Sequence, residues 1–132
     1  MELLFEKFSG TNARLDDRIS ITVNRAFGFT KKYFDDNKLS NFKYVVLFYD
    51  KKNMAIGFQF INDEKEPHKF TLIRSKQGYG ASVVATSFFK TYNLEPKKFR
   101  GKYPWKRKNM PEIGRLFIIY LKDKEVAKKE PS

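Results

Sequence analysis

Residues 42–61 read FKYVVLFYDKKNMAIGFQFI, and this stretch decides the fold class. Phe42–Tyr49 is apolar without alternation, which predicts a strand buried on both faces. Asp50–Asn53 (DKKN) is typical of a hairpin turn. Met54–Ile61 returns with Ile56, Phe58 and Phe60 in alternation, the period of a strand. The stretch therefore predicts an antiparallel hairpin.

The residues before this hairpin predict a strand followed by a short helix. Ile19–Val23 alternates apolar and polar side chains, and Gly28 is expected to break that pattern. Thr30 is a good N-cap for a helix over residues 31–37, with Tyr33 and Phe34 facing the core and Leu39 closing it.

The second half repeats this order of elements. Residues 62–67 (NDEKEP) suggest a linker, 70–75 a strand, 78–80 (GYG) a tight turn and 81–85 another strand. Thr86 is expected to cap a helix that extends through Tyr92, and 114–121 forms an apolar strand. A shift of 55 residues aligns the two helices and places Leu39 on Leu94. An internal duplication explains this match, and coincidence among short β-rich segments is the alternative.

These elements predict a β-rich α+β fold. Its two similar halves, about 18–61 and 74–121, each run strand, hinge, short helix and hairpin, and together form a barrel-like sheet core. We expect one domain over residues 1–122 and a flexible charged tail over 123–132, because the chain has 132 residues and its tail alternates charges.

The composition excludes several classes of chemistry. The chain has no cysteine and one histidine, His68, which argues against disulfides, thiol catalysis, cysteine-ligated metals and a Ser-His-Asp triad. No signal peptide or spanning segment is apparent, so a cytoplasmic protein without a membrane partner is expected. The sequence predicts no cofactor, no metal and no enzymatic activity. A nuclease using metal-binding carboxylates at Asp16-Asp17 or Asp35-Asp36 is a weaker alternative.

The basic charge is concentrated in the second half of the chain. The net charge is +12, with 11 basic and 10 acidic residues in 1–66 against 16 and 5 in 67–132. A concentrated positive field indicates a polyanionic partner. A solubilising lysine-rich surface is the alternative.

Residues 97–108 (KKFRGKYPWKRK) are the strongest candidate site, a basic loop. Seven of the twelve are basic, and the rest include Phe, Tyr and the only Trp. Cations neutralise phosphates, and interleaved aromatic faces stack on unpaired bases. The alternative is that Tyr103 and Trp105 simply cap the core. Other cations, near the first hinge and before the GYG turn, extend this surface, and Arg25 with Asn24 would read base edges. The predicted nucleic-acid-binding residues are Lys97, Lys98, Arg100, Lys102, Tyr103, Trp105, Lys106, Arg107, Lys108, Arg25, Lys31, Lys32, Arg74 and Lys76.

The order of elements resembles the looped-hinge, swapped-hairpin DNA-binding family of the AbrB, SpoVT and MraZ type. The resemblance rests on Ile19–Val23, the hinge Ala26–Thr30, the helix 31–38, Leu39 and the hairpin 44–60. Thr30 stands where the family has proline. The resemblance implies a DNA-binding transcriptional regulator, DNA rather than RNA as partner, and a homo-oligomer as an option. A protein-interaction module with incidental basic charge is the alternative function.

Overall fold

The computed structural model describes residues 2–7, 15–75 and 80–124 as two antiparallel sheets of five strands each. The first sheet has the order β6-β7-β2-β1-β8 and the second the order β5-β3-β4-β10-β9. The strands are β1 (Ile19–Thr22), β2 (Ala26–Thr30), β3 (Tyr44–Asp50), β4 (Ala55–Ile61), β5 (Phe70–Thr71), β6 (Ile73–Arg74), β7 (Gly80–Val84), β8 (Gly101–Tyr103), β9 (Lys106–Met110) and β10 (Gly114–Tyr120). The helical segments are α1 (Lys31–Asp36), η2 (Leu39–Asn41), α2 (Thr86–Thr91), α3 (Pro96–Phe99) and η3 (Leu121–Asp123). The β-rich α+β prediction is confirmed, although within the described residues neither strand order closes into a barrel.

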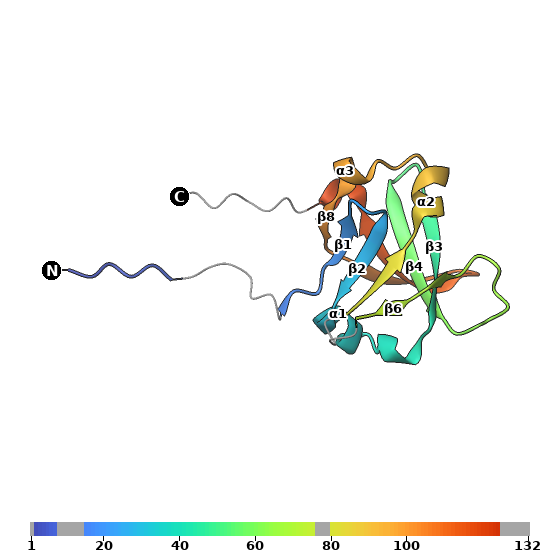
Figure 1. The fold of residues 1–132 in the computed structure, drawn as a ribbon, viewed down its shortest axis with the longest axis horizontal. Coiled ribbons are helices and arrows are strands. Elements are labelled where there is room, and N and C mark those ends of the chain that lie inside the picture. Colours follow the sequence, from blue (N-terminus) through green and yellow to red (C-terminus); the bar gives the residue numbers. More distant parts are fainter. Residues whose placement is uncertain (1, 8–14, 76–79, 125–132) are drawn as a thin grey trace.

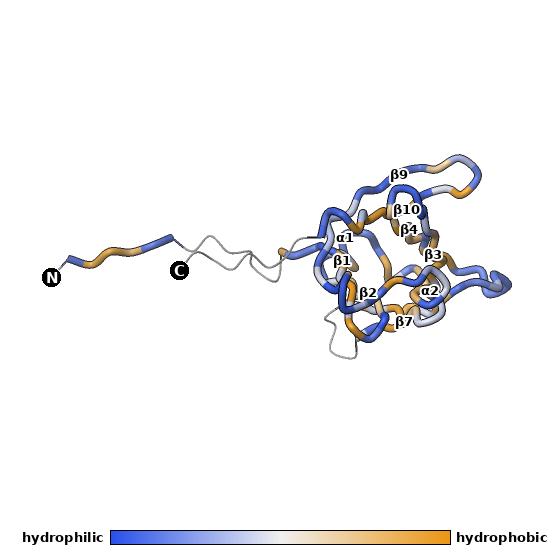
Figure 2. The backbone as a smooth tube through the Cα atoms, turned by 90° about the horizontal axis from the view of Figure 1, so that it is seen from above, coloured by the Kyte–Doolittle hydropathy of each residue, from blue (hydrophilic) through white to orange (hydrophobic). Residues whose placement is uncertain are grey.

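The core lies between the two sheets, which face each other in Figures 1 and 2. Phe27 and Phe29 on β2 meet Phe58 on β4, with ring centroids 4.9 and 5.7 Å apart in edge-to-face contacts. Each such pair adds about 0.5–1.5 kcal/mol beyond its burial. Tyr33 of α1 is fully buried and stacks on Phe29, so α1 closes one end of the sandwich.

The first half of the chain folds largely as its pattern predicts. The side chain of Thr30 accepts a hydrogen bond from the backbone N–H of Tyr33, as an N-cap does. The hairpin of β3 and β4 pairs Tyr44 with Ile61 through to Asp50 with Ala55. The predicted break at Gly28 is wrong, because Gly28 lies in the middle of β2 opposite Ser20. A Cβ on Gly28 would collide with the Ser20 hydroxyl, so glycine is required there by space.

Three further predictions differ from the structure. Only Val45 of β3 is buried, so this strand is not covered on both faces. Residues 70–75 form two short strands in different sheets, β5 beside β3 and β6 beside β7. Thr86 begins α2 and does not cap it, since Ala85 is the N-cap and offers no side-chain hydrogen bond. Residues 78 and 79 of the predicted GYG turn (78–80) lie outside the described residues.

The residues at and after α1 correspond to those at and after α2 at a constant offset along the chain. α1 begins at Lys31 and α2 at Thr86, 55 positions later. The same offset relates Lys38 to Asn93, which both have positive φ (54° and 58°). The next residue is a buried leucine in each case, Leu39 or Leu94. Both leucines therefore enter the core from the same kind of helix end.

Candidate nucleic-acid interface

The basic segment 97–108 is not one loop, which corrects the prediction made from its composition. Pro96 occupies the first turn of α3, where its missing N–H is harmless, and Glu95 caps this helix. β8 then pairs with β1 in one sheet, and β9 pairs with β10 in the other. The cations of this segment therefore lie on three separate elements.

β9 carries the exposed cations of the segment along the edge of its sheet. Lys106, Arg107 and Lys108 are all exposed, and β9 is the last strand in the order β5-β3-β4-β10-β9. Opposite residues on paired strands share a face, so the register with β10 places Lys106 and Lys108 on the outer face, opposite Ile118 and Leu116. Within the part of the chain that the structure describes, none of the three cations has an acidic partner within salt-bridge distance.

The two aromatic residues of the segment support the fold. Tyr103 is fully buried and its hydroxyl donates to the carbonyl oxygen of Phe99. Burial raises the pKa of Tyr103 to about 12. The predicted stacking role of Tyr103 is wrong for this fold, because its ring has no face open to solvent. Trp105 is half-buried against Tyr33 and Phe117, and its Nε1 donates to the carbonyl oxygen of Asp17 at 2.9 Å.

Lys102 belongs to a structural ion network centred on the buried carboxylate of Asp16. Asp16 is 5% exposed and accepts hydrogen bonds from Arg18 Nε at 2.9 Å and from Lys102 Nζ at 2.8 Å. Burial alone would raise the pKa of Asp16, but the hydrogen bonds from Arg18 and Lys102 outweigh it and hold this pKa well below its ordinary value. The network ties β8 to the chain before β1, so a phosphate contact by Lys102 would compete with its ion pair to Asp16.

The two lysines at the first hinge are also paired within their own helix. Lys31 Nζ lies 2.6 Å from Asp35, and Lys32 Nζ lies 2.7 Å from Asp36. The hydrogen bond that Lys32 donates to the Asp36 carboxylate raises the pKa of Lys32. These pairs have the favourable i,i+4 spacing of a helix surface. They also satisfy two of the carboxylates that the nuclease alternative requires.

The other predicted cations are scattered over the fold. Arg25 is half-buried in the β1–β2 turn with positive φ, next to Asn24. Arg74 donates to the carbonyl oxygen of Ser40 at 2.5 Å and lies over the ring of Phe34. Lys76 lies outside the described residues.

α3 contributes a second exposed basic group. Lys97, Lys98 and Arg100 are exposed at this short helix and its C-cap. Lys98 Nζ lies 5.4 Å from the ring centroid of Phe99, and its carbonyl oxygen accepts from Lys124. These residues are exposed, but they are on a different element from the β9 cations.

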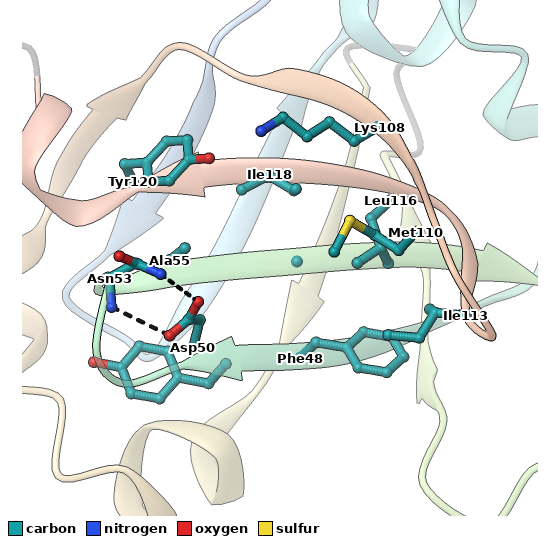
Figure 3. Close-up of a pocket in the computed structure, with 12 residues that line it drawn as sticks. Phe48, Asp50, Asn53, Ala55, Lys108, Met110, Ile113, Leu116, Ile118 and Tyr120 are labelled. Atoms are coloured by element: carbon teal, nitrogen blue, oxygen red, sulfur yellow. Dashed lines mark hydrogen bonds between the residues drawn. The ribbon is translucent and has the colours of Figure 1, made fainter.

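A groove on the outer face of the second sheet was not expected from the sequence. It has a volume of about 540 Å³ and runs beside β9 across β10, β4 and β3 (Figure 3). Its lining is mostly apolar and consists of Phe48, Tyr49, Asp50, Asn53, Ala55, Gly57, Lys108, Met110, Ile113, Leu116, Ile118 and Tyr120. The available signal was the unbroken apolar run of β10, whose Leu116, Ile118 and Tyr120 face outward.

The turn between β9 and β10 is fastened over one end of this groove. Gln59 of β4 donates from Nε2 to the carbonyl oxygen of Ile113 at 2.7 Å. Met110 and Ile113 consequently stand beside Leu116 above the sheet (Figure 3). The hydrogen bond holds the basic strand and the apolar floor in one fixed arrangement.

The described residues show no metal-ligating cluster of three or more His, Asp or Glu side chains. Within the same residues, every helix is too short or too polar to cross a membrane. Comparisons of the chain with protein-family models, with curated proteins and with solved structures found no match.

Proposed function

We propose that this protein binds nucleic acid without catalysing a reaction, and that β9 supplies its main phosphate contacts. The observation that carries the proposal is the contrast between the cations. Lys31, Lys32 and Lys102 have acidic partners within the fold, whereas Lys106, Arg107 and Lys108 have none among the described residues. Unpaired cations on a rigid strand can replace the counterions of a phosphate backbone.

The geometry of β9 suits a backbone of regularly spaced phosphates. Lys106 and Lys108 are two residues apart on one strand, so their Cα atoms are about 6.6 Å apart on the same face. Pairing with β10 fixes the strand, and little backbone freedom remains to be lost on binding. A second basic group, Lys97 and Lys98 on α3, can extend the contact along the chain of phosphates.

Neutralising two of these cations tests the proposal. We expect K106Q/K108Q to lower the affinity for a labelled oligonucleotide by about 10- to 30-fold at about 0.1 M salt. Each lost phosphate contact releases fewer counterions, which lowers the logarithm of the binding constant by roughly 0.7 at this salt concentration. K65Q/K90Q removes the same charge from exposed positions outside the groove and serves as the matched control. Equal affinities of the two variants, measured by fluorescence anisotropy, would contradict the proposal.

The alternative is a protein-interaction module in which the lysines of β9 only keep an exposed strand edge from pairing with other chains. Edge strands commonly carry lysine for this reason. In that case K106Q/K108Q would show association of the protein with itself and no loss of nucleic-acid affinity.

We further infer that the two halves arose by duplication and that the protein is a cytoplasmic, DNA-binding transcriptional regulator of the looped-hinge type. The constant offset of 55 residues between the helices, the positive-φ positions and the buried leucines supports the duplication. The symmetric strand order β6-β7-β2-β1 supports paired halves. Selection from a random duplex pool tests the regulator: enrichment of one sequence would support it, and no enrichment would contradict it.

A further inference from the structure

The outer groove and the cations of β9 form one continuous surface. The registers place Phe48, Gly57, Ile118 and Lys106 directly opposite one another in a row across β3, β4, β10 and β9. Since neighbouring strands are about 4.8 Å apart, this row spans roughly 14 Å from an aromatic side chain to a cation. Lys108 lies on the same face of β9 and lines the groove itself.

The floor of the groove is flat at its centre because Gly57 has no side chain there. A Cβ at Gly57 would lie 3.2 Å from Leu116 Cδ1 and 3.5 Å from Phe48 Cβ, so glycine lets these two side chains pack closely against the sheet. Phe48 and Tyr120 are half-buried at two sides of this space (Figure 3). An apolar, flat chemical group can lie in the groove over the side chains of Leu116 and Ile118, between the two aromatic side chains.

We propose that this groove binds unpaired bases of a single-stranded nucleic acid whose phosphates contact Lys106 and Lys108. The inference rests on the proposed function and specifies its ligand. It also moves the base-stacking site from Tyr103 and Trp105 to Phe48 and Tyr120 on the opposite side of the second sheet. Stacking on aromatic faces beside a basic rim is the usual way in which proteins bind single strands.

The distribution of charge favours a single strand over other apolar ligands. The cations follow one long side of the groove, which matches a ligand with repeated anions along one side and flat apolar groups along the other. An acyl chain with an anionic head would require its cation at an end of the groove. One end instead carries the carboxylate of Asp50, held by hydrogen bonds from the backbone N–H of Asn53 at 3.2 Å and its Nδ2 at 2.7 Å.

The Asp50 end of the groove can also contact base edges. The Asn53 hydrogen bonds lower the pKa of Asp50, so its carboxylate is ionised at neutral pH. A carboxylate accepts hydrogen bonds from the exocyclic amino groups of bases. A duplex cannot use the aromatic faces, because its bases are stacked on one another in its interior.

Two measurements test the proposal together: the relative affinity for single-stranded and duplex DNA, and the effect of substitutions at Phe48. We expect a labelled single-stranded DNA 12-mer to bind more tightly than a duplex of the same length in fluorescence anisotropy. Phe48→Leu should weaken the single strand about fivefold or more with little effect on the duplex, whereas Phe48→Tyr should retain the affinity. Phe34→Leu makes the same change at a half-buried phenylalanine of α1 outside the groove, and should have no effect.

A spectroscopic readout makes the test independent of affinity. In F48W, the added indole should be quenched by the single strand and not by the duplex. Circular dichroism of each variant verifies that it is folded.

The outcomes separate this inference from the proposed function. If K106Q/K108Q weakens binding while the Phe48 variants behave like the native protein, the groove inference is overturned and the phosphate contacts remain. If no nucleic acid binds, both fail.

Leu3, Leu4 and Phe5, between Glu2 and Glu6, are exposed and offer another occupant for this groove. The indole fluorescence of F48W could depend on protein concentration, and this dependence could be lost when residues 2–7 are deleted. That result would assign the groove to a second copy of the chain and overturn the inference.

Discussion

Replacing Asp16 with asparagine should destabilise the fold more than any other single loss of a carboxylate. Asp16 is buried, and the side chains of its partners Arg18 and Lys102 are 25% and 53% exposed. A hydrogen bond between charged groups contributes about 1.5–3 kcal/mol. The partners can regain water when Asp16 is lost, so we expect a net loss of about 2 kcal/mol, well under the sum for two bonds.

This loss should be visible as a lower melting temperature. For a chain of this size 1 kcal/mol corresponds to about 4 °C, so Asp16→Asn should melt about 8 °C lower in differential scanning calorimetry. Asp35→Asn removes a carboxylate from an exposed pair with Lys31 and should cost under about 0.5 kcal/mol. Equal melting temperatures for Asp16→Asn and Asp35→Asn would refute the role assigned to the buried network.

The Asp16 network also predicts how the stability of the protein changes with pH. Because the folded pKa of Asp16 is depressed, its contribution is fully present above the unfolded value of about 3.9 and declines as the pH falls toward the folded value. The native protein should therefore lose stability between about pH 5 and pH 2, and Asp16→Asn should lose less over that range. Parallel curves for the two proteins would show that the network does not couple protonation to folding.

Two further predictions concern buried groups and helix ends. Tyr103→Phe leaves the carbonyl oxygen of Phe99 without its donor and should cost about 1 kcal/mol in chemical denaturation, while nucleic-acid affinity stays unchanged. Burial raises the pKa of Tyr103 to about 12, so its contribution to stability is complete below about pH 10 and is lost as the pH rises through 12. Tyr103→Phe should therefore lose less stability than the native protein over this alkaline range. A decline as steep as that of the native protein would refute the buried role of the Tyr103 hydroxyl. Lys38→Gly should stabilise the protein by about 0.5–1 kcal/mol, since lysine is strained at positive φ, and Asn93→Gly should stabilise it less because asparagine tolerates this conformation. Destabilisation by Lys38→Gly in urea unfolding would contradict this reading of the two helix ends.

Local signals in the sequence were sufficient to predict α1 and the hairpin of β3 and β4. Thr30 and the apolar Tyr33 lie three residues apart, which is enough to place the start of α1 and its buried face. The DKKN turn and the alternation of Ile56, Phe58 and Phe60 are equally local, and they fix the register of β3 and β4. The pairs Lys31–Asp35 and Lys32–Asp36 also follow from i,i+4 spacing and could have been recognised in advance.

Long-range pairing explains why the basic segment was misjudged. Tyr103 lies opposite Ile19, more than eighty residues earlier in the chain, and no local pattern indicates that contact. A run rich in lysine and aromatic residues looks like an exposed loop until the partner strand is known. The Asp16–Lys102 pair depends on the same distant contact.

The groove could not be predicted because it requires the outer faces of four strands at once. Phe48, Gly57 and Ile118 become neighbours only through the registers of β3, β4 and β10. The sequence shows β10 as apolar on both faces, but it does not show that the outer face is left open.

The salt dependence of single-stranded DNA binding is the most direct test of the central claim, that β9 supplies the phosphate contacts. The slope of log affinity against log salt should be less steep by about 1.4 for K106Q/K108Q than for the native protein, because each phosphate contact with a single strand contributes about 0.7. K65Q/K90Q should keep the native slope. A slope unchanged by K106Q/K108Q, or changed equally by both pairs of substitutions, would contradict the account.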